Sequence, residues 1–123
     1  MANLTASPTP KNLVADRDQD LTHEITLPAG SYLSGGASGW ALQYQVTHPT
    51  TGTPVFTKTT GGSGIVVTTG GSTTVDAVFT VTIPDTDILA AAVSLGVKYN
   101  WIFKRTDAGS EVNLDAGTLT FRR

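Results

Sequence analysis

Apolar and polar residues alternate most regularly near the end of the chain, between residues 97 and 104. One phase of this alternation holds Val97, Tyr99, Trp101 and Phe103. Because successive side chains of a strand point to opposite faces, the pattern predicts a core strand with three aromatic rings on its inner face. Residues 107–110 (DAGS) predict a tight turn, since Gly109 can adopt the left-handed conformation that short hairpin loops need. The sequence therefore predicts a β-hairpin over residues 97–121.

The second strand of this hairpin changes phase along its length. Val112 and Leu114 belong to one phase, whereas Leu119 and Phe121 belong to the other. The inner face must shift by one residue between these pairs, and Gly117 lies in the interval. Because a glycine inside a strand often marks a β-bulge, we expect a bulge at Gly117.

Three earlier segments, at 21–27, 40–47 and 75–83, show the same alternation and predict strands. Their inward phases are Leu21, His23, Ile25 and Leu27; Trp40, Leu42, Tyr44 and Val46; and Val75, Ala77, Phe79, Val81 and Ile83. Shorter strands are predicted at 55–59 and from residue 65. The first of these is expected at a sheet edge, where Lys58 would discourage unwanted pairing.

Glycine- and proline-rich turns separate these strands, which number about seven or eight. Asp85 or Thr86 is expected to cap one short helical turn over residues 88–93, with Gly96 after its end. This order predicts an all-β fold, an immunoglobulin-like two-sheet sandwich of antiparallel strands with Trp40 in its core. A jelly roll or a small barrel is the alternative.

The length of 123 residues and the 39% hydrophobic content fit one globular domain. Residues 13–123 are assigned to this domain. Residues 1–12 contain Pro8 and Pro10 among small polar residues, which favours an extended N-terminal arm. The arm is interpreted either as a solvated tail or as an anchor on another subunit.

Charge and cysteine content exclude several partners and cofactors. The net charge of −2 gives no electrostatic basis for binding nucleic acid or an anionic membrane. The absence of cysteine excludes disulfides, a thiolate nucleophile and a cysteine-based zinc site. No apolar run approaches the ~20 residues of a membrane span, and the N-terminus lacks the pattern of a signal peptide, so synthesis in a cytoplasm is expected.

An acidic segment copies the opening of a calcium-binding loop. Asp16, Asp18 and Asp20 have the spacing of its first ligands. However, Leu21 replaces the glycine of that loop and Leu27 replaces its closing glutamate. A solvated turn is therefore the preferred interpretation, and no metal site is assigned.

The remaining candidates for catalysis have simpler interpretations. His23 is in phase with core residues, His48 lies in a turn before Pro49, and no third metal ligand is apparent beside them. No motif brings serine, histidine and aspartate into a catalytic arrangement. We therefore predict a non-enzymatic protein without a cofactor.

Apolar residues on predicted outer faces are the better candidates for function. Val78 and Ile102 would be exposed there, either as isolated residues or as parts of a contact patch. Lys98 and Lys104 flank Ile102 on the same strand, Phe56 marks the predicted edge strand, and two prolines mark the arm. The candidate interface residues are thus Val78, Ile102, Phe56, Lys98, Lys104, Pro8 and Pro10.

The order of these features resembles a known family. The segments are ADRDQDLTHEITL, WALQYQVTHPTTGTPVFTK, IPDTDILAA and GVKYNWIFKRTDAGSEVNLDAGTLTF. Over residues 13–121 they resemble the small immunoglobulin-like structural proteins of tailed bacteriophages, including the type at the N-terminus of baseplate upper proteins. This resemblance implies a virion protein without catalytic residues, made in the host cytoplasm. Because no receptor-binding region follows in the sequence, a stand-alone accessory protein is favoured over a receptor-binding role.

We therefore expect an accessory capsid decoration or stabilising protein. Its partners would be major capsid or tail subunits, bound by many copies related by symmetry. A tail or baseplate adaptor is one alternative. A host-surface glycan-binding module is another, and Tyr32 is then the best aromatic platform, because both tryptophans are predicted to face inward.

Overall fold

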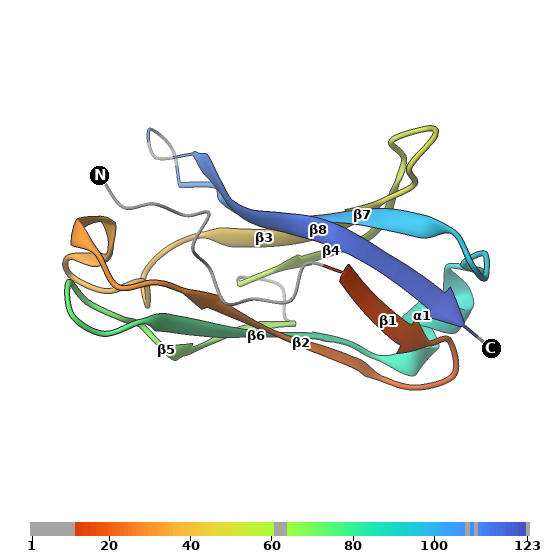
Figure 1. Ribbon diagram of the computed structural model, residues 1–123, viewed down its shortest axis with the longest axis horizontal. Helices are drawn as coiled ribbons and strands as arrows, with labels where there is room; N and C mark the ends of the chain where they lie inside the picture. The colour runs from red at the N-terminus through yellow and green to blue at the C-terminus, as the bar shows by residue number, and fades with distance from the viewer. Residues whose placement is uncertain (1–11, 61–63, 108, 110, 123) are drawn as a thin grey trace.

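The computed structural model describes residues 12–60, 64–107, 109 and 111–122. Eight strands lie within these residues and form two facing sheets (Figure 1). They are β1 (Asn12–Asp16), β2 (Leu21–Leu27), β3 (Leu42–Thr47), β4 (Pro54–Thr59), β5 (Ile65–Thr69), β6 (Ala77–Ile83), β7 (Lys98–Arg105) and β8 (Val112–Arg122). A short 3₁₀ segment, η2 (Ser31–Leu33), and a helix of less than two turns, α1 (Asp85–Ala90), lie in the connections. The predicted all-β sandwich is confirmed.

The strand order is that of an immunoglobulin-type sandwich. The larger sheet has the order β1-β8-β7-β3-β4, and the smaller one has the order β2-β6-β5. If β1 to β8 are named A, B, C, C′, D, E, F and G, the sheets are A-G-F-C-C′ and B-E-D. The expectation of antiparallel strands is wrong for β1, which pairs in parallel with β8. Asn12, which was assigned to the arm, is the first residue of β1, and the rest of the predicted arm lies outside the described residues.

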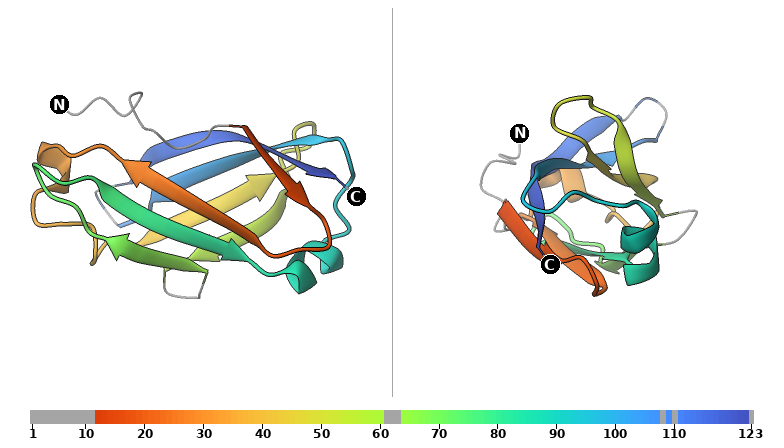
Figure 2. Two further views of the ribbon diagram at one scale, coloured as in Figure 1. Left: turned by 60° about the horizontal axis from the view of Figure 1, so that its bottom comes forward. Right: turned by 90° about the vertical axis from the view of Figure 1, so that its right-hand side faces the viewer.

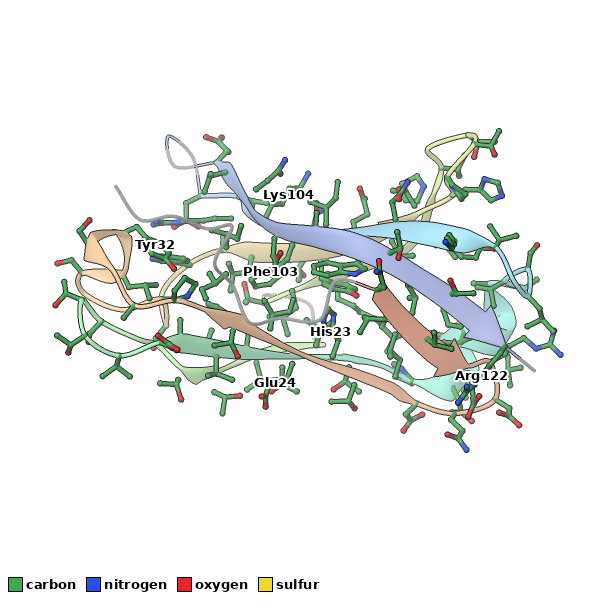
Figure 3. All side chains as sticks on the ribbon, viewed as in Figure 1. His23, Glu24, Tyr32, Phe103, Lys104 and Arg122 are labelled. Atoms are coloured by element: carbon green, nitrogen blue, oxygen red, sulfur yellow. The ribbon has the colours of Figure 1, made fainter. Side chains whose placement is uncertain are left out.

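The space between the sheets is filled by most of the predicted inward residues of β2, β3, β6 and β7. Val75 is an exception: it was predicted to face inward, but β6 begins at Ala77 and Val75 is 51% exposed in the preceding turn. Figure 3 shows His23 and Phe103 between the sheets, and Lys104 and Glu24 on opposite outer sides. The largest fully buried side chain is that of Trp101, which lies 5.7 Å from the ring of Tyr44 in a stacked arrangement. Local alternation therefore identified most of the core correctly.

The phase shift in β8 is real, but its predicted position at Gly117 is wrong. Lys104 pairs with Asn113 and Phe103 pairs with Asp115, so Leu114 is the extra residue. Pairing is regular from Asp115 to Thr118. Gly117 instead lies directly opposite Trp101 on β7, within the regular part of the ladder.

The prediction that Trp40 is a core residue within a strand is also wrong. Trp40 precedes β3 and is half-buried at the periphery of the core. Its N–H donates to the Ala37 carbonyl in a turn, and the Ala41 N–H donates to the carboxylate of Asp107. These two bonds hold residues 40 and 41 outside the ladder, so that the strand begins at Leu42.

The predicted helical turn is present, but it begins earlier and is capped differently. The helix α1 covers Asp85–Ala90, and neither Asp85 nor Thr86 acts as a side-chain cap. Instead, the Asp85 N–H donates to the Asp20 carboxylate at 2.8 Å, from the turn before β2. The acidic turn thus satisfies a free donor at the start of the helix.

Candidate interaction surfaces

The predicted interface residues do not form one surface. Ile102, Lys98 and Lys104 project from the outer face of β7, the central strand of the larger sheet. Val78 projects from the outer face of β6, the central strand of the smaller sheet. The sandwich therefore places Val78 on the side opposite to the other three residues.

Phe56 is not available as a contact side chain. It is only 5% exposed, and its ring lies 6.0 Å from that of Phe121 in the core. Its strand, β4, is an edge of the larger sheet as predicted, so a partner could reach the strand but not this ring. Pro8 and Pro10 lie outside the described residues.

Lys98, Asn100, Ile102 and Lys104 form a surface that we call the β7 face. Ile102 is flanked by Gln45 on β3 and Ala116 on β8. The neighbours of the two lysines across the strands are neutral and mostly polar, namely Thr120, Gln43 and Asn113. Among the described residues, neither lysine forms an ion pair. The β7 face therefore has a half-buried aliphatic centre between two lysines that form no ion pair within the part of the chain that the structure describes.

The outer face of the smaller sheet has a different chemistry. Val78 lies between Thr26 and Thr69 on the neighbouring strands. Other outward residues of this sheet are Thr22, Glu24, Val66, Thr68, Thr80 and Thr82. This face is rich in threonine and carries one acidic group, whereas the β7 face carries two basic groups.

One end of the sandwich is formed by the connections β2–β3, β5–β6 and β7–β8. The N–H groups of Gly30 and Ala37 donate to the carbonyls of Ser72 and Gly70. These two bonds hold the long β2–β3 connection against the β5–β6 connection. The two connections are therefore fixed relative to each other, and we call this end of the sandwich the loop end.

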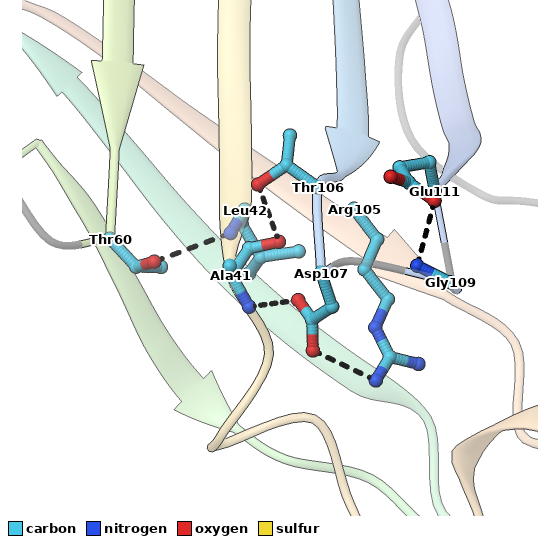
Figure 4. Close-up of polar contacts among 8 residues, drawn as sticks. All are labelled: Ala41, Leu42, Thr60, Arg105, Thr106, Asp107, Gly109 and Glu111. Atoms are coloured by element: carbon cyan, nitrogen blue, oxygen red, sulfur yellow. Dashed lines mark hydrogen bonds and ion pairs between the residues drawn. The ribbon is translucent and has the colours of Figure 1, made fainter.

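A second set of contacts joins the β2–β3 connection to the end of the β7–β8 hairpin (Figure 4). Asp107 accepts the Ala41 N–H and forms an ion pair with Arg105 at 3.0 Å. The Thr106 N–H donates to the Ala41 carbonyl at 2.8 Å. The Arg105 guanidinium lies 4.3 Å from the centre of the Trp40 ring, which is a cation–π contact. We call these residues the Trp40 corner.

The contacts in the Trp40 corner favour the charged form of the Asp107 carboxylate. The hydrogen bond from Arg105, followed by that from the Ala41 N–H, lowers the pKa of Asp107 below its usual value. Sequence reasoning missed this cluster. Arg105 lies two residues after Phe103 and therefore has the same inward phase. Applying the alternation as far as Arg105 would have predicted an inward-facing arginine, which needs an acidic partner.

The aromatic rings of the loop end are engaged within the domain. Tyr32 donates its hydroxyl hydrogen to the Pro28 carbonyl, and burial, together with the charge of Asp76, raises its pKa. Trp40 is covered by Arg105 on one side of its ring. A glycan platform requires an open aromatic face, and this arrangement gives it little support.

The three aspartates of the acidic segment serve separate purposes. Asp16 forms an ion pair with Arg122 at 2.8 Å, and Asp20 binds the start of α1. Asp18 is exposed. Within the described ranges, no three His, Cys, Asp or Glu residues are grouped so that they could hold a metal ion.

Both histidines have structural contacts. His23 is buried, with Nδ1 3.1 Å from the Tyr44 hydroxyl and its ring 4.7 Å from that of Trp101. Burial raises the pKa of Tyr44 well above its usual value. His48 accepts the Thr50 N–H through Nδ1 at 3.2 Å, which fixes its turn. These contacts match the interpretation of the two histidines as a core residue and a turn residue.

Comparison with known proteins does not assign this chain to a family. A scan against models of protein families and a search of curated proteins gave no match. No helix among the described residues is long and apolar enough to cross a membrane. The surfaces are therefore interpreted from their own chemistry.

Proposed function

We propose that this chain is a non-enzymatic structural protein of a bacteriophage particle, an accessory protein that decorates or stabilises the capsid by packing on other subunits. The resemblance of residues 13–121 to immunoglobulin-like phage proteins supports the assignment to a virion. The immunoglobulin-type strand order is compatible with it. Fold alone does not define function, so the proposal depends on a contact surface.

The β7 face is the observation that carries this proposal. Ile102 offers a half-buried apolar centre, and Lys98 and Lys104 offer two charges without an ion pair among the described residues. Such a surface complements an acidic or amide-rich partner that covers the isoleucine. Each contact is modest, but repetition over a symmetric particle multiplies its effect.

The test is incorporation into particles of the phage that encodes the chain. We expect the triple variant Lys98→Glu, Ile102→Glu, Lys104→Glu to fold but to fall at least about tenfold in copies per particle, measured by quantitative mass spectrometry, since each 1.4 kcal/mol of lost contact is a factor of ten. The matched control is Val78→Glu, which changes an apolar residue on the opposite face and should leave the copy number unchanged.

Two results would contradict the proposal. The first is the absence of the native chain from purified particles, and the second is a native copy number for the triple variant. Electron microscopy of the particle then distinguishes the capsid from the tail or baseplate as the place of attachment.

A further inference from the structure

The strand β1 is attached to the domain through one neighbour. It lies at the margin of the larger sheet, and among the described residues it pairs only with β8, over Asn12–Asp16. Figure 2 shows β1 in red, with the chain reversing after it into the orange β2. Because β2 belongs to the smaller sheet, no ladder joins these two consecutive strands. The place of β1 is therefore determined by the edge of β8 and by a short connection.

Little of β1 belongs to the core. Ala15 is its one buried residue, Leu13 is partly buried, and Val14 is 60% exposed. The largest fully buried side chains all lie on other elements. A segment that buries so little apolar surface can separate from a domain at a small cost compared with global unfolding.

The edge of β8 nevertheless matches this strand closely. The Thr118 hydroxyl donates to the side-chain carbonyl of Asn12, and Arg122 forms the ion pair with Asp16, both at 2.8 Å. The Arg17 N–H donates to the Arg122 carbonyl and extends the pairing beyond the strand. If β1 left, these groups of β8 would lose their partners. A strand of the same sequence restores every one of these contacts.

The connection between β1 and β2 consists of residues 17–20. A turn closed by the Gln19 N–H and the Asp16 carbonyl, 3.3 Å apart, reverses the chain here. The end of the connection is held by the bond from the Asp85 N–H to the Asp20 carboxylate. None of the four residues is buried, so extending the connection breaks one long turn bond and no core contact. Short connections favour strand exchange, because extension removes the need for a tight reversal.

We propose that β1 is an exchangeable strand through which a second copy of this chain binds, so that the β1 of each copy pairs with the β8 of the other. Residues 17–20 extend in each chain, and the register is the one observed within a single copy. The bond between Asn12 and Thr118 and the ion pair between Asp16 and Arg122 then form between copies. Each copy donates one strand and accepts one, so the assembly closes as a two-fold dimer.

The chemistry of the β8 edge selects a second copy as the partner. A foreign strand would need a carboxylate beside Arg122, an acceptor beside Thr118 and a small inward side chain opposite Phe121, where β1 provides Ala15. The exchanged dimer and two single copies contain the same strand contacts. Their free energies differ by the relieved turn and by the entropy of association. The dimer is therefore favoured where copies are held close together, and it forms slowly because β1 must first separate.

The first test uses the absence of cysteine from the chain. Val14 and Thr120 are partners across the ladder, and neighbouring strands lie about 4.8 Å apart, within the range that a disulfide spans. Val14→Cys and Thr120→Cys are made in separate chains, so a disulfide between residues 14 and 120 forms only between copies. The two variants are mixed, incubated at high concentration and mildly oxidised, and the disulfides are identified by mass spectrometry of proteolytic peptides.

The control mixes Val14→Cys with Val66→Cys. Val66 is 61% exposed on the smaller sheet and Thr120 is partly covered, so chance collision favours the control pair. We expect the 14–120 disulfide to exceed the 14–66 disulfide at least about tenfold, because exchange holds the two thiols at a high effective concentration. Equal yields would overturn the proposal.

The second test shortens the connection. Deleting Asp18 and Gln19 leaves two residues to reverse the chain and to span the ~10 Å between the sheets. β1 can then pair only with another copy, and we expect sedimentation to give the mass of a dimer at concentrations where the native chain is mainly monomeric. The control deletes Thr50 and Thr51 between β3 and β4, which are neighbours in one sheet and can be joined by a tight turn. This variant should remain a monomer.

A folded monomer after deletion of Asp18 and Gln19 would contradict the proposal. Dimers of both deletion variants would also contradict it, because association would then not depend on this connection. If the shortened chain fails to fold, the cysteine pair decides, since those variants leave residues 17–20 intact. This inference does not depend on assignment to a virion.

Discussion

The two tryptophans of this domain show how the same sequence pattern leads to two different environments. Trp101 lies inside β7, is fully buried and contacts Tyr44 and His23. Trp40 also begins an alternating segment, yet it lies outside β3 and contacts Arg105. Alternation predicts burial only where the backbone has joined a ladder. At residues 40 and 41, a turn and the carboxylate of Asp107 accept the backbone N–H groups that a ladder would need.

The strongest test of this difference is truncation of the buried ring. Trp101→Ala should destabilise the domain by about 3–5 kcal/mol, because it leaves a large cavity opposite Gly117. Urea denaturation followed by circular dichroism measures this free energy of unfolding. Trp101→Phe should cost clearly less, and an equal loss in both variants would indicate that the indole fits no better than a phenyl ring.

Truncation of the peripheral ring should have a smaller effect. Trp40→Ala removes the cation–π contact with Arg105 and some packing at the edge of the core, and we expect a loss of about 1 kcal/mol. The same denaturation measurement applies. A loss as large as that of Trp101→Ala would mean that Trp40 is a core residue after all.

The charge of Asp107 should stabilise the Trp40 corner in a pH-dependent way. Its lowered pKa means that its contribution is fully present above its ordinary value of 3.8 and is lost as the pH falls through the lower folded-state pKa. Asp107→Asn, which retains an acceptor for the Ala41 N–H, should therefore be less stable than the native chain at pH 7. The difference should shrink below pH 3.8, as monitored by the melting temperature. A constant difference across this range would contradict the role of the charge.

The test with the smallest expected effect on stability measures the solvent exposure of each tryptophan ring. Trp40→Phe retains an aromatic ring under Arg105, so the melting temperature should change little. In the native chain, acrylamide should quench only part of the tryptophan fluorescence. In Trp40→Phe the remaining emission, from the buried Trp101, should resist quenching. Unchanged quenching would show that Trp40 is as protected as Trp101.

As with the two tryptophans, the features of the fold that depend on local sequence were predicted more reliably than those that depend on distant residues. The inward phases of β2, β6 and β7 are local properties, and they were recognised correctly except for Val75, which precedes β6 and is exposed. Errors arose where a distant residue determined the outcome. The carboxylate that accepts the Ala41 N–H belongs to Asp107, 66 residues further along the chain. The position of the bulge at Leu114 depends on how β8 pairs with β7. The parallel pairing of β1 with β8 joins the two ends of the domain and has no local signal.

The candidate surfaces were predicted only in part for the same reason. The outward positions of Ile102, Lys98 and Lys104 follow from the alternation of one strand. Their separation from Val78 depends on which sheet each strand joins, and the burial of Phe56 depends on contact with Phe121 from the end of the chain. These relationships appear only once the sheets are assembled.

The parallel pairing of β1 and β8 also determines how the domain responds to mechanical force. The chain enters β1 at Asn12 and leaves β8 at Arg122, and the two strands are paired from Asn12–Thr118 to Asp16–Arg122. Tension applied between these two points pulls the strands past each other along their length. The whole ladder and the Asp16–Arg122 ion pair are then loaded in shear and must yield together, whereas a hairpin pulled at its open end can unzip one pair at a time.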